Sequence, residues 1–247
     1  MELWFLPLLT LVGVAVGFIN VMAAGGSLIS MPVLILLGLD PATANGTNRI
    51  AILVQNITAV NRFRSKGFSE PRLSLSLSLS TIPGAIAGAV AAIAIDPVVF
   101  NRILGLVLVL AVFLILGNER PPKQDREGKE RAIQAHLAMV GVGFYGGFLQ
   151  GGVGFLIMPI LYRLLRLDLV RVNMHKAFII GAYTIPALLV FAAQGKVWWL
   201  GGFALAAGNA AGAWVGTHVT ITGGERAVRI VFVIAVIVMG GRLIFAG

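Results

Sequence analysis

Long apolar runs separated by short polar breaks dominate the chain. A helix that spans a bilayer needs about 20 mainly apolar residues. The pattern predicts helical segments in the first half at Leu3–Ala23, Ser27–Leu39, Thr43–Asn61, Leu73–Ile95 and Val98–Gly117. In the second half it predicts segments at Ala132–Gln150, Gly154–Leu167, Asn173–Ala193, Trp198–Val219 and Ala227–Phe245. We therefore expect an all-α polytopic membrane protein.

One stretch, Leu73–Ser80, alternates leucine and serine as a strand would. An isolated strand cannot span a bilayer, because its backbone groups would find no partner in lipid. We therefore expect a helix here, with serine on its packed faces.

The two halves resemble each other at an offset that stays between 127 and 130 residues. The matched positions are Gly17–Asn20 with Gly147–Gln150, Met31–Leu34 with Met158–Leu161, Leu39-Asp40 with Leu167-Asp168, and Asn45 with Asn173. A duplicated unit is the simplest explanation of such a long series. It predicts a first repeat at residues 1–117, a charged linker at 118–131 and a second repeat at 132–247.

An odd number of spans in each repeat gives the two copies opposite orientations in the membrane. The positive-inside rule places basic loops in the cytoplasm. With five spans in each repeat, this places all but four of the 19 Lys and Arg residues on the cytoplasmic side. If the short second and seventh segments do not cross, the split is more even, so the rule favours five spans. Both termini are then periplasmic.

Composition supports a membrane protein and excludes several other classes. The chain is 58% hydrophobic and only 12% charged, and it carries a formal net charge of +9. Such a positive charge in a soluble protein suggests nucleic-acid binding. Here the basic residues cluster between apolar runs, so we expect no nucleic-acid partner. There is no cysteine, and no histidine or carboxylate cluster has the spacing of a metal site. We expect no metal, no cofactor and no catalytic residues.

The second and seventh segments are shorter than the roughly 20 residues of an ordinary spanning helix, and each follows a glycine-rich break. Gly25, Gly26 and Ser27 mark the first break, and Gly151 and Gly152 mark the second. The first N–H groups of a helix lack partners within the helix, and the helix dipole is positive there. These breaks are therefore candidate anion sites within the membrane. The alternative is that their glycines only allow close helix packing.

The third and eighth segments begin with unusual polarity. The first contains Asn45, Asn48 and Arg49, and the second contains Asn173 and Lys176. Polar and ionisable groups at membrane depth are costly, so they usually have a function. We predict that the two cations attract an anion and that the asparagines supply amide hydrogen bonds. In the alternative interpretation, the cations extend to the membrane surfaces and Asn45 is a helix N-cap.

Other polar residues are candidates for lining a transport path. Asn20 and Gln150 match across the repeats, so they either line the site or form hydrogen bonds between helices. Gln55 and Asn56 lie deep in the third segment. His175 is a possible proton carrier or a structural residue.

Several further residues have simpler expected roles. Asp40 and Asp168 are expected to cap or turn the chain after the short helices. Glycine pairs spaced four residues apart are expected to pack helices closely. These pairs are Gly13/Gly17, Gly84/Gly88, Gly143/Gly147, Gly208/Gly212 and Gly212/Gly216.

Several of these motifs together resemble those of the TauE/SafE sulfite exporter family. The resemblance lies in Gly25–Leu34, Leu39–Asn48, Asn173–Lys176, Gln194–Trp198 and Gly208–Gly216. It implies export of sulfite or a related sulfur-containing anion across the bacterial inner membrane. One departure is Met22–Gly26, where the family often has a longer glycine string. The methyl groups of Ala23 and Ala24 are expected to narrow the pocket or to change the preferred anion.

We therefore expect a multi-pass inner-membrane carrier that exports a small anion by alternating access between its two repeats. A passive anion channel of the same architecture remains an alternative, as does a carrier for a sulfonate or thiosulfate. The expected partners are the anion and the lipid bilayer, and a homo-oligomer is also possible. Since no nucleophile or paired-acid constellation is visible, we do not expect an enzyme.

Overall fold

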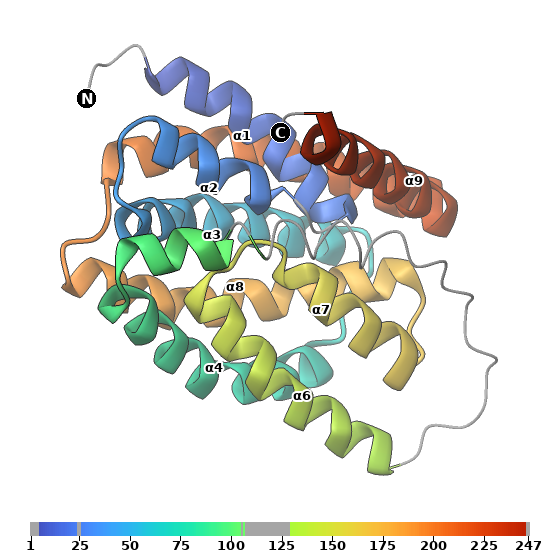
Figure 1. The fold of residues 1–247 in the computed structure, drawn as a ribbon. Coiled ribbons are helices and arrows are strands. Elements are labelled where there is room, and N and C mark those ends of the chain that lie inside the picture. Colours follow the sequence, from blue (N-terminus) through green and yellow to red (C-terminus); the bar gives the residue numbers. More distant parts are fainter. Residues whose placement is uncertain (1–4, 24–25, 105, 107–128, 246–247) are drawn as a thin grey trace.

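The structure is a computed structural model. It describes residues 5–23, 26–104, 106 and 129–245 (Figure 1), with side chains for all of these except 23, 129, 130 and 224–245. Its elements are α1 (Phe5–Ala23), α2 (Ser27–Leu36), α3 (Pro41–Ser65), α4 (Pro71–Ala94), α6 (Lys129–Phe148), α7 (Val153–Pro159), the π-helix η1 (Ile160–Leu164), α8 (Leu169–Ala193) and α9 (Trp199–Phe245). Residues 97–104 are also helical, and the described part of the chain contains no strand. The expected all-α class is confirmed.

The alternating leucine–serine stretch is helical, as predicted, within α4. Pro71 occupies the first turn, where its missing N–H group removes no helical hydrogen bond. The Ser78 hydroxyl donates to the main-chain oxygen of Ser74 at 2.7 Å. This hydrogen bond satisfies a serine within an apolar helix without a partner from another segment.

The two helices after the glycine breaks are short, as expected. α2 has ten residues, which span about 15 Å against a bilayer core of about 30 Å. α7 has seven residues and ends at Pro159, where the chain continues as η1. A proline has no N–H group to donate to the preceding turn. Neither short helix can cross the membrane alone.

Two helices begin earlier than the hydrophobic pattern predicted. α3 begins at Pro41 and α8 at Leu169, because Asp40 and Asp168 are their N-caps. Asp40 accepts a hydrogen bond from the Thr43 amide at 3.2 Å. Asp168 accepts from the amides of Val170 and Arg171, both at 3.0 Å. The predicted capping role of the two aspartates is confirmed.

One predicted break is wrong. The expected ninth and tenth segments belong to one helical run, α9, of 47 residues. The residues between the two segments, 220–226, are assigned to the helix as well. A straight helix of this length would reach about 70 Å. Figure 1 shows that the run changes direction, so that its orange and red parts form separate arms.

The fifth predicted segment and the linker fall mostly outside the described residues. Only 97–104 and 106 of that segment are described, and they are helical. α6 begins at Lys129, so the last three residues assigned to the linker belong to this helix.

Two polar contacts show that α3 and α8 run in opposite directions. Lys196, just after α8, lies 3.5 Å from Asp40, which precedes α3. At the other end, Arg171 near the start of α8 lies 3.3 Å from Glu70, which follows α3. The start of each helix therefore lies at the same end of the molecule as the end of the other.

Close packing surrounds this central pair. α1 packs mainly against α9, α4 packs against α6, and α3 and α8 contact each other and the outer pairs. A Cβ added at Gly17 would collide with the main-chain oxygen of Asn209, and one at Gly147 with that of Ala85. The packing role predicted for the spaced glycine pairs is confirmed, since the same kind of collision recurs at Gly13, Gly84, Gly88, Gly143, Gly208 and Gly212.

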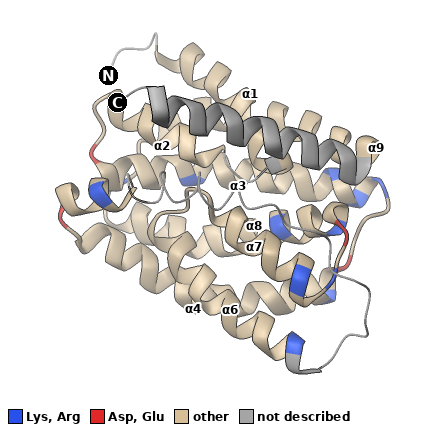
Figure 2. Cartoon of the chain, turned by 45° about the vertical axis from the view of Figure 1, so that its right-hand side comes forward, with Lys and Arg blue, Asp and Glu red and all other residues tan. Residues whose placement is uncertain are grey.

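The outer surface suits a bilayer. Large apolar side chains such as Leu11, Leu137 and Leu189 are 64–70% exposed. Three helices in the described part are long and apolar enough to cross a membrane, and the spans are Phe5–Met22, Pro71–Ala94 and Leu169–Ala193. Figure 2 shows that most Lys and Arg residues gather at one end of the helices, where α3 ends and α8 begins. The chain is a polytopic membrane protein.

Candidate functional site

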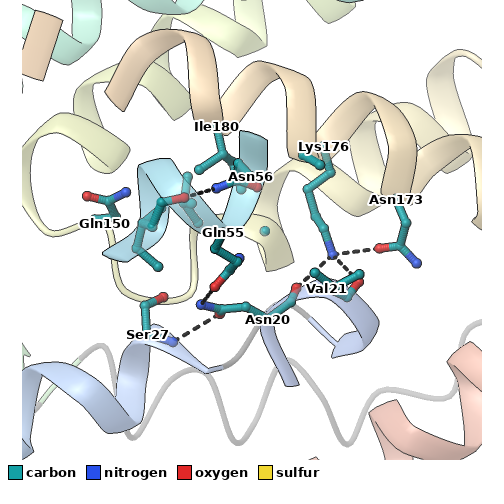
Figure 3. Close-up of a pocket in the computed structure, with 13 residues that line it drawn as sticks. Asn20, Val21, Ser27, Gln55, Asn56, Gln150, Asn173, Lys176 and Ile180 are labelled. Atoms are coloured by element: carbon teal, nitrogen blue, oxygen red, sulfur yellow. Dashed lines mark hydrogen bonds between the residues drawn. The ribbon is translucent and has the colours of Figure 1, made fainter. Parts of the chain in front are cut away.

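A small cavity lies where the two breaks meet the central helices (Figure 3). The last turn of α1 and the start of α2 contribute to it, as do Gln150 and the start of α7, and α3 and α8 complete it. The residues that line it are Asn20, Val21, Ser27, Ile52, Gln55, Asn56, Gln150, Val153, Gly154, Asn173, Lys176, Ala177 and Ile180. The volume open to the centre of a water molecule is about 20 Å³, which is enough for about one water molecule.

Among the described residues that line the cavity, Lys176 is the only charged one. Its side chain is 2% exposed. The Nζ donates to the main-chain oxygens of Asn20 at 3.1 Å and Val21 at 3.0 Å, and to Oδ1 of Asn173 at 2.6 Å. An ammonium group has three hydrogens to donate, so these contacts use all of them. The charge is held beside the C-terminal carbonyls of α1, where the helix dipole is negative.

Asn20 connects four helices at this point (Figure 3). Its Oδ1 accepts the Ser27 amide, the first of α2, at 3.0 Å. Its Nδ2 donates to Oε1 of Gln55 on α3 at 3.0 Å, and its main-chain oxygen accepts from Lys176 on α8. The first amide of α2, which the sequence predicted to be open to an anion, is therefore occupied by a protein oxygen.

The network extends to Asn209 on α9, a residue that the sequence analysis did not select. Its Nδ2 donates to Oε1 of Gln55 at 3.1 Å, and its side chain is fully buried. A polar residue inside an apolar segment was the signal that could have identified it. Its place in the glycine-rich stretch Gly208–Gly216 made close packing the more prominent prediction.

Gln150 lines the cavity from the opposite side. It follows α6 in a left-handed conformation, with φ of 61°, and its Nε2 donates to the Thr184 hydroxyl at 3.1 Å. Its Oε1 has no hydrogen-bond partner in the described structure, although the side chain is only 1% exposed. Gln150 therefore presents a buried acceptor that no described residue satisfies.

Arg49 does not line the cavity. Its guanidinium donates to the main-chain oxygens of Gly146 and Gly147, in the last turn of α6, and to Oδ1 of Asn45 at 3.2 Å. Nδ2 of Asn45 donates to the main-chain oxygen of Phe148 at 2.7 Å. Arg49 and Asn45 together therefore satisfy the last carbonyls of α6. They do not extend to the surface, and Asn45 is not an N-cap.

Three other predicted site residues also lie outside the cavity lining. Oδ1 of Asn48 accepts from the Ser30 hydroxyl at 2.8 Å. His175 lies beside the start of α4, with Nδ1 2.8 Å from the Ser74 hydroxyl and Nε2 3.5 Å from Glu70. A Cβ added at Gly26 would meet the main-chain oxygen of Val16 and the side chain of Asn20.

The glycines of the second break stand just beside the cavity. Gly152 has φ of 73°, a left-handed conformation that glycine adopts without strain. A side-chain hydrogen bond also holds this break, since the Tyr145 hydroxyl donates to the main-chain oxygen of Gly151 at 2.5 Å. Gly25 lies outside the described residues.

The chemistry of the cavity suits reversible binding of an anion. Its polar groups are one ammonium, one hydroxyl and neutral amides, and none of the residues that line it is a carboxylate. No cluster of metal-ligating side chains occurs among the described residues. A single buried cation with hydrogen-bonding amides favours one negative charge more than a neutral solute.

Comparison with known proteins identifies the family. A sequence profile described as sulfite exporter TauE/SafE matches residues 9–243. The chain belongs to the TauE/SafE family. The resemblance predicted from the sequence motifs is confirmed.

The relatives of this TauE/SafE protein are named as transporters. It is 28% identical over 242 residues to "Probable membrane transporter protein YfcA" of Escherichia coli (strain K12), across 97% of this chain and 90% of that protein. It is 26% identical over 244 residues to a "Probable membrane transporter protein" of Haemophilus influenzae, across 97% and 94% of the two chains. No solved structure matches. This TauE/SafE protein is a membrane transporter and not an enzyme.

Proposed function

We propose that this transporter exports sulfite or a related small sulfur-containing anion across the bacterial inner membrane. The observation that carries the proposal is the position of Lys176, a buried ammonium among neutral amides in a cavity between the two helix breaks. Asn173 and Ser27 supply further donors beside it. The family name supports a sulfur anion, and the names of the relatives leave the substrate open.

Within this proposal the predicted site residues have different roles. Lys176, Asn173 and Ser27 bind the anion, and Asn20, Gln55, Asn56 and Gln150 line its path. Arg49, Asn45 and Asn48 support the site by holding α3 against α6 and α2. Gly26, Gly151 and Gly152 allow the chain to lie close to the cavity, and Gly25 stays a predicted site residue outside the described part. His175 faces α4 and Glu70, so we assign it no contact with the anion.

The proposed mechanism is alternating access between two inverted repeats. The opposite directions of α3 and α8, which occupy matched positions in the repeats, support this arrangement. Movement of one repeat against the other exposes the cavity first to the cytoplasm and then to the periplasm. Export of an anion from a negative interior is favourable by roughly 2.3 kcal/mol per charge per 100 mV, so outward flow needs no coupling ion.

The orientation follows from the basic residues. The end at which they gather in Figure 2 is assigned to the cytoplasm. The loop between α3 and α4 and the start of α8 then face the cytoplasm. The loop between α8 and α9 and both termini face the periplasm.

Flux in proteoliposomes tests the function. Purified protein is reconstituted, and uptake of labelled sulfite, thiosulfate, sulfate and methanesulfonate is measured with and without the same anion inside. We expect saturable sulfite flux that is stimulated by internal anion, because a carrier exchanges its substrate. Flux without saturation or exchange stimulation indicates the channel alternative. If none of the sulfur anions crosses faster than in empty vesicles, the proposed function is wrong.

A lysine pair provides a matched comparison for the site. Lys176→Met removes the buried ammonium and keeps an unbranched side chain, and it should abolish sulfite flux. Lys196→Met removes a lysine that is 39% exposed and lies in the loop after α8. This control should retain flux. Equal flux in the two variants would exclude Lys176 from anion binding.

A further inference from the structure

Two donors of the proposed site, the Ser27 amide and the Lys176 ammonium, already donate hydrogen bonds to one residue, Asn20. Asn20 lies in the last turn of α1, lines the cavity and is 7% exposed. Its Oδ1 accepts the first amide of α2, from Ser27, and its main-chain oxygen accepts from the Lys176 ammonium. These two donors are the first N–H group of a helix and a buried cation, both of which favour a negatively charged oxygen.

We propose that the Asn20 side chain is an internal substitute for the transported anion, which displaces it on binding. Its amide oxygen holds the Ser27 donor while the site is empty of substrate. The inference rests on the proposed function, since it assigns a role within the same site. It gives Asn20 a part in gating, in addition to lining the path.

Two features of the cavity support displacement over simple addition of a ligand. The Ser27 amide is occupied by Oδ1 of Asn20, so an anion can contact this amide only by replacing that oxygen. The three hydrogens of Lys176, in contrast, are held by main-chain oxygens and by Asn173 and stay in place when the Asn20 side chain moves. The cavity has room for about one water molecule, so a sulfur oxyanion also needs a side chain to move. The Asn20 main chain belongs to α1, whereas its side chain can leave by rotation about its own bonds.

An unsatisfied donor lies beside this position. Asn173 also lines the cavity and is 1% exposed, and its Oδ1 holds Lys176. Its Nδ2 has no hydrogen-bond partner in the described structure. A buried N–H group without a partner is costly, and an anion oxygen would satisfy it. The cavity therefore contains one donor, Nδ2 of Asn173, and one acceptor, Oε1 of Gln150, that lack a partner in the described structure.

Displacement would also change the contacts between helices. Nδ2 of Asn20 holds Gln55 on α3, and its Oδ1 holds α2. When the side chain leaves, α1 loses both of these contacts at once. Binding of the anion would then loosen the end of α1 beside the break, which is the movement that alternating access requires.

The described part of the second half has no equivalent arrangement. Gln150 stands at the matched position, but its Nε2 donates to Thr184 and its Oε1 accepts nothing in the described structure. The internal substitute therefore exists on one side of the cavity. This asymmetry assigns the gating role to the Asn20 side chain at the end of α1.

Equilibrium binding tests the proposal on variants of Asn20. Asn20→Leu and Asn20→Ala remove the amide oxygen, the first with little change of volume. Sulfite binding to the purified full-length protein is measured by calorimetry, and sulfite flux is measured in proteoliposomes. We expect both variants to bind sulfite about ten-fold more tightly, the factor expected from loss of one competing buried hydrogen bond. The maximal flux should fall, because the empty site no longer closes.

A charged variant and a control complete the test. Asn20→Asp places a carboxylate on the Ser27 amide and beside the Lys176 ammonium, so it should weaken sulfite binding at least ten-fold. Asn209→Ala removes the other hydrogen bond to Gln55 and touches neither Ser27 nor Lys176, so its sulfite affinity should equal that of the wild type. Weaker or unchanged binding in both Asn20→Leu and Asn20→Ala would overturn the proposal.

The two proposals fail in different ways. Wild-type protein that binds sulfite but does not transport it would contradict the proposed function, while the affinities of the Asn20 variants still decide the role of Asn20. Wild-type protein that transports sulfite, with weaker binding in the Asn20→Leu and Asn20→Ala variants, would make Asn20 an ordinary ligand. If the wild type neither binds nor transports sulfite, both proposals are wrong for this anion.

Discussion

Arg49 and Lys176 each donate hydrogen bonds to carbonyls in the last turn of a helix from the other half of the chain. Arg49 on α3 holds Gly146 and Gly147 of α6, and Lys176 on α8 holds Asn20 and Val21 of α1. The last four carbonyls of a helix lack partners within it, and a cation there is favoured by the helix dipole. Each cation therefore stabilises the end of a helix that precedes a break.

The two cations differ in what surrounds them. The Arg49 guanidinium lies 4.7 Å from the centre of the Phe191 ring and outside the cavity lining. Lys176 lines the cavity. A planar guanidinium with several donors suits a fixed structural role, whereas an ammonium is a compact charge on a flexible stem. We infer that Arg49 mainly stabilises the fold and that Lys176 also serves the anion.

Replacement of Arg49 should therefore lower stability more than it lowers anion affinity. Arg49→Met removes the donors of two buried main-chain oxygens, each worth roughly 1–3 kcal/mol, so we expect a loss of about 3 kcal/mol. Thermal unfolding in detergent measures it, and calorimetry measures sulfite affinity in the protein that remains folded. Arg102→Met, at an exposed arginine, is the control and should change neither. A folded Arg49→Met protein with weak sulfite binding would give Arg49 a direct role.

Glycine contacts predict which helix positions tolerate a methyl group. A Cβ at Gly143 of α6 would collide with the main-chain oxygen of Thr81 on α4, and backbone cannot move aside cheaply. We expect Gly143→Ala to cost roughly 1–3 kcal/mol by overpacking. Gly141, on the same helix, has nothing within 4 Å of its Cβ position. Gly141→Ala should therefore be neutral or stabilising by up to about 1 kcal/mol. Equal melting temperatures would show that α4 and α6 are not packed this closely.

The sequence predicted most of the elements because lipid imposes a simple rule. Every backbone group within the bilayer needs an internal partner, so long apolar runs must be helices. The short α2 and α7 and the two aspartate caps followed from glycine, proline and aspartate at matched positions. The polar residues between two apolar runs of α9, from Thr220 to Arg226, predicted a break, because local composition does not show that the helical run continues through them.

The candidate site was predicted only in part, for a different reason. Asn20, Ser27, Gln55, Asn56, Gln150, Asn173 and Lys176 do come together around the cavity. Arg49 was grouped with Lys176 because both cations follow a matched asparagine in sequence. Which direction a side chain takes from a helix, and which carbonyls it can reach, depends on the packing of α6 and α1. Sequence spacing alone does not contain that information.

The cap of α3 should make stability depend on pH in the acid range. Partial burial alone would raise the pKa of Asp40, but hydrogen bonds from the Thr43 hydroxyl and amide and the nearby Lys196 ammonium outweigh it and hold this pKa below its ordinary value. A lowered pKa in the folded state stabilises the protein above the unfolded pKa of about 3.9. This contribution is lost as the pH falls through the lower pKa of the folded state.

Asn at position 40 isolates that effect. Asn is also a good N-cap but does not titrate in this range, so Asp40→Asn should match the wild type at low pH and be less stable near neutrality. Thermal unfolding between pH 3 and 7, chosen here to span the aspartate range of about 3.9, measures the difference. Asp40→Ala should lose about 1 kcal/mol through loss of the cap. A constant difference between wild type and Asp40→Asn across the whole range would contradict an ionised cap.

The absence of cysteine makes the proposed orientation directly testable, because any cysteine introduced is the only one to be labelled. Ser69 lies in the loop between α3 and α4, Gln194 lies in the loop after α8, and both are exposed. If the basic end faces the cytoplasm, Ser69→Cys should resist a membrane-impermeant maleimide in intact spheroplasts and react after lysis. Gln194→Cys should react in intact spheroplasts. The opposite result would mean that the transporter has the inverse orientation in the membrane. Labelling of both from outside would contradict the structure, because the Asp40–Lys196 and Glu70–Arg171 contacts place these two loops at opposite ends of the molecule.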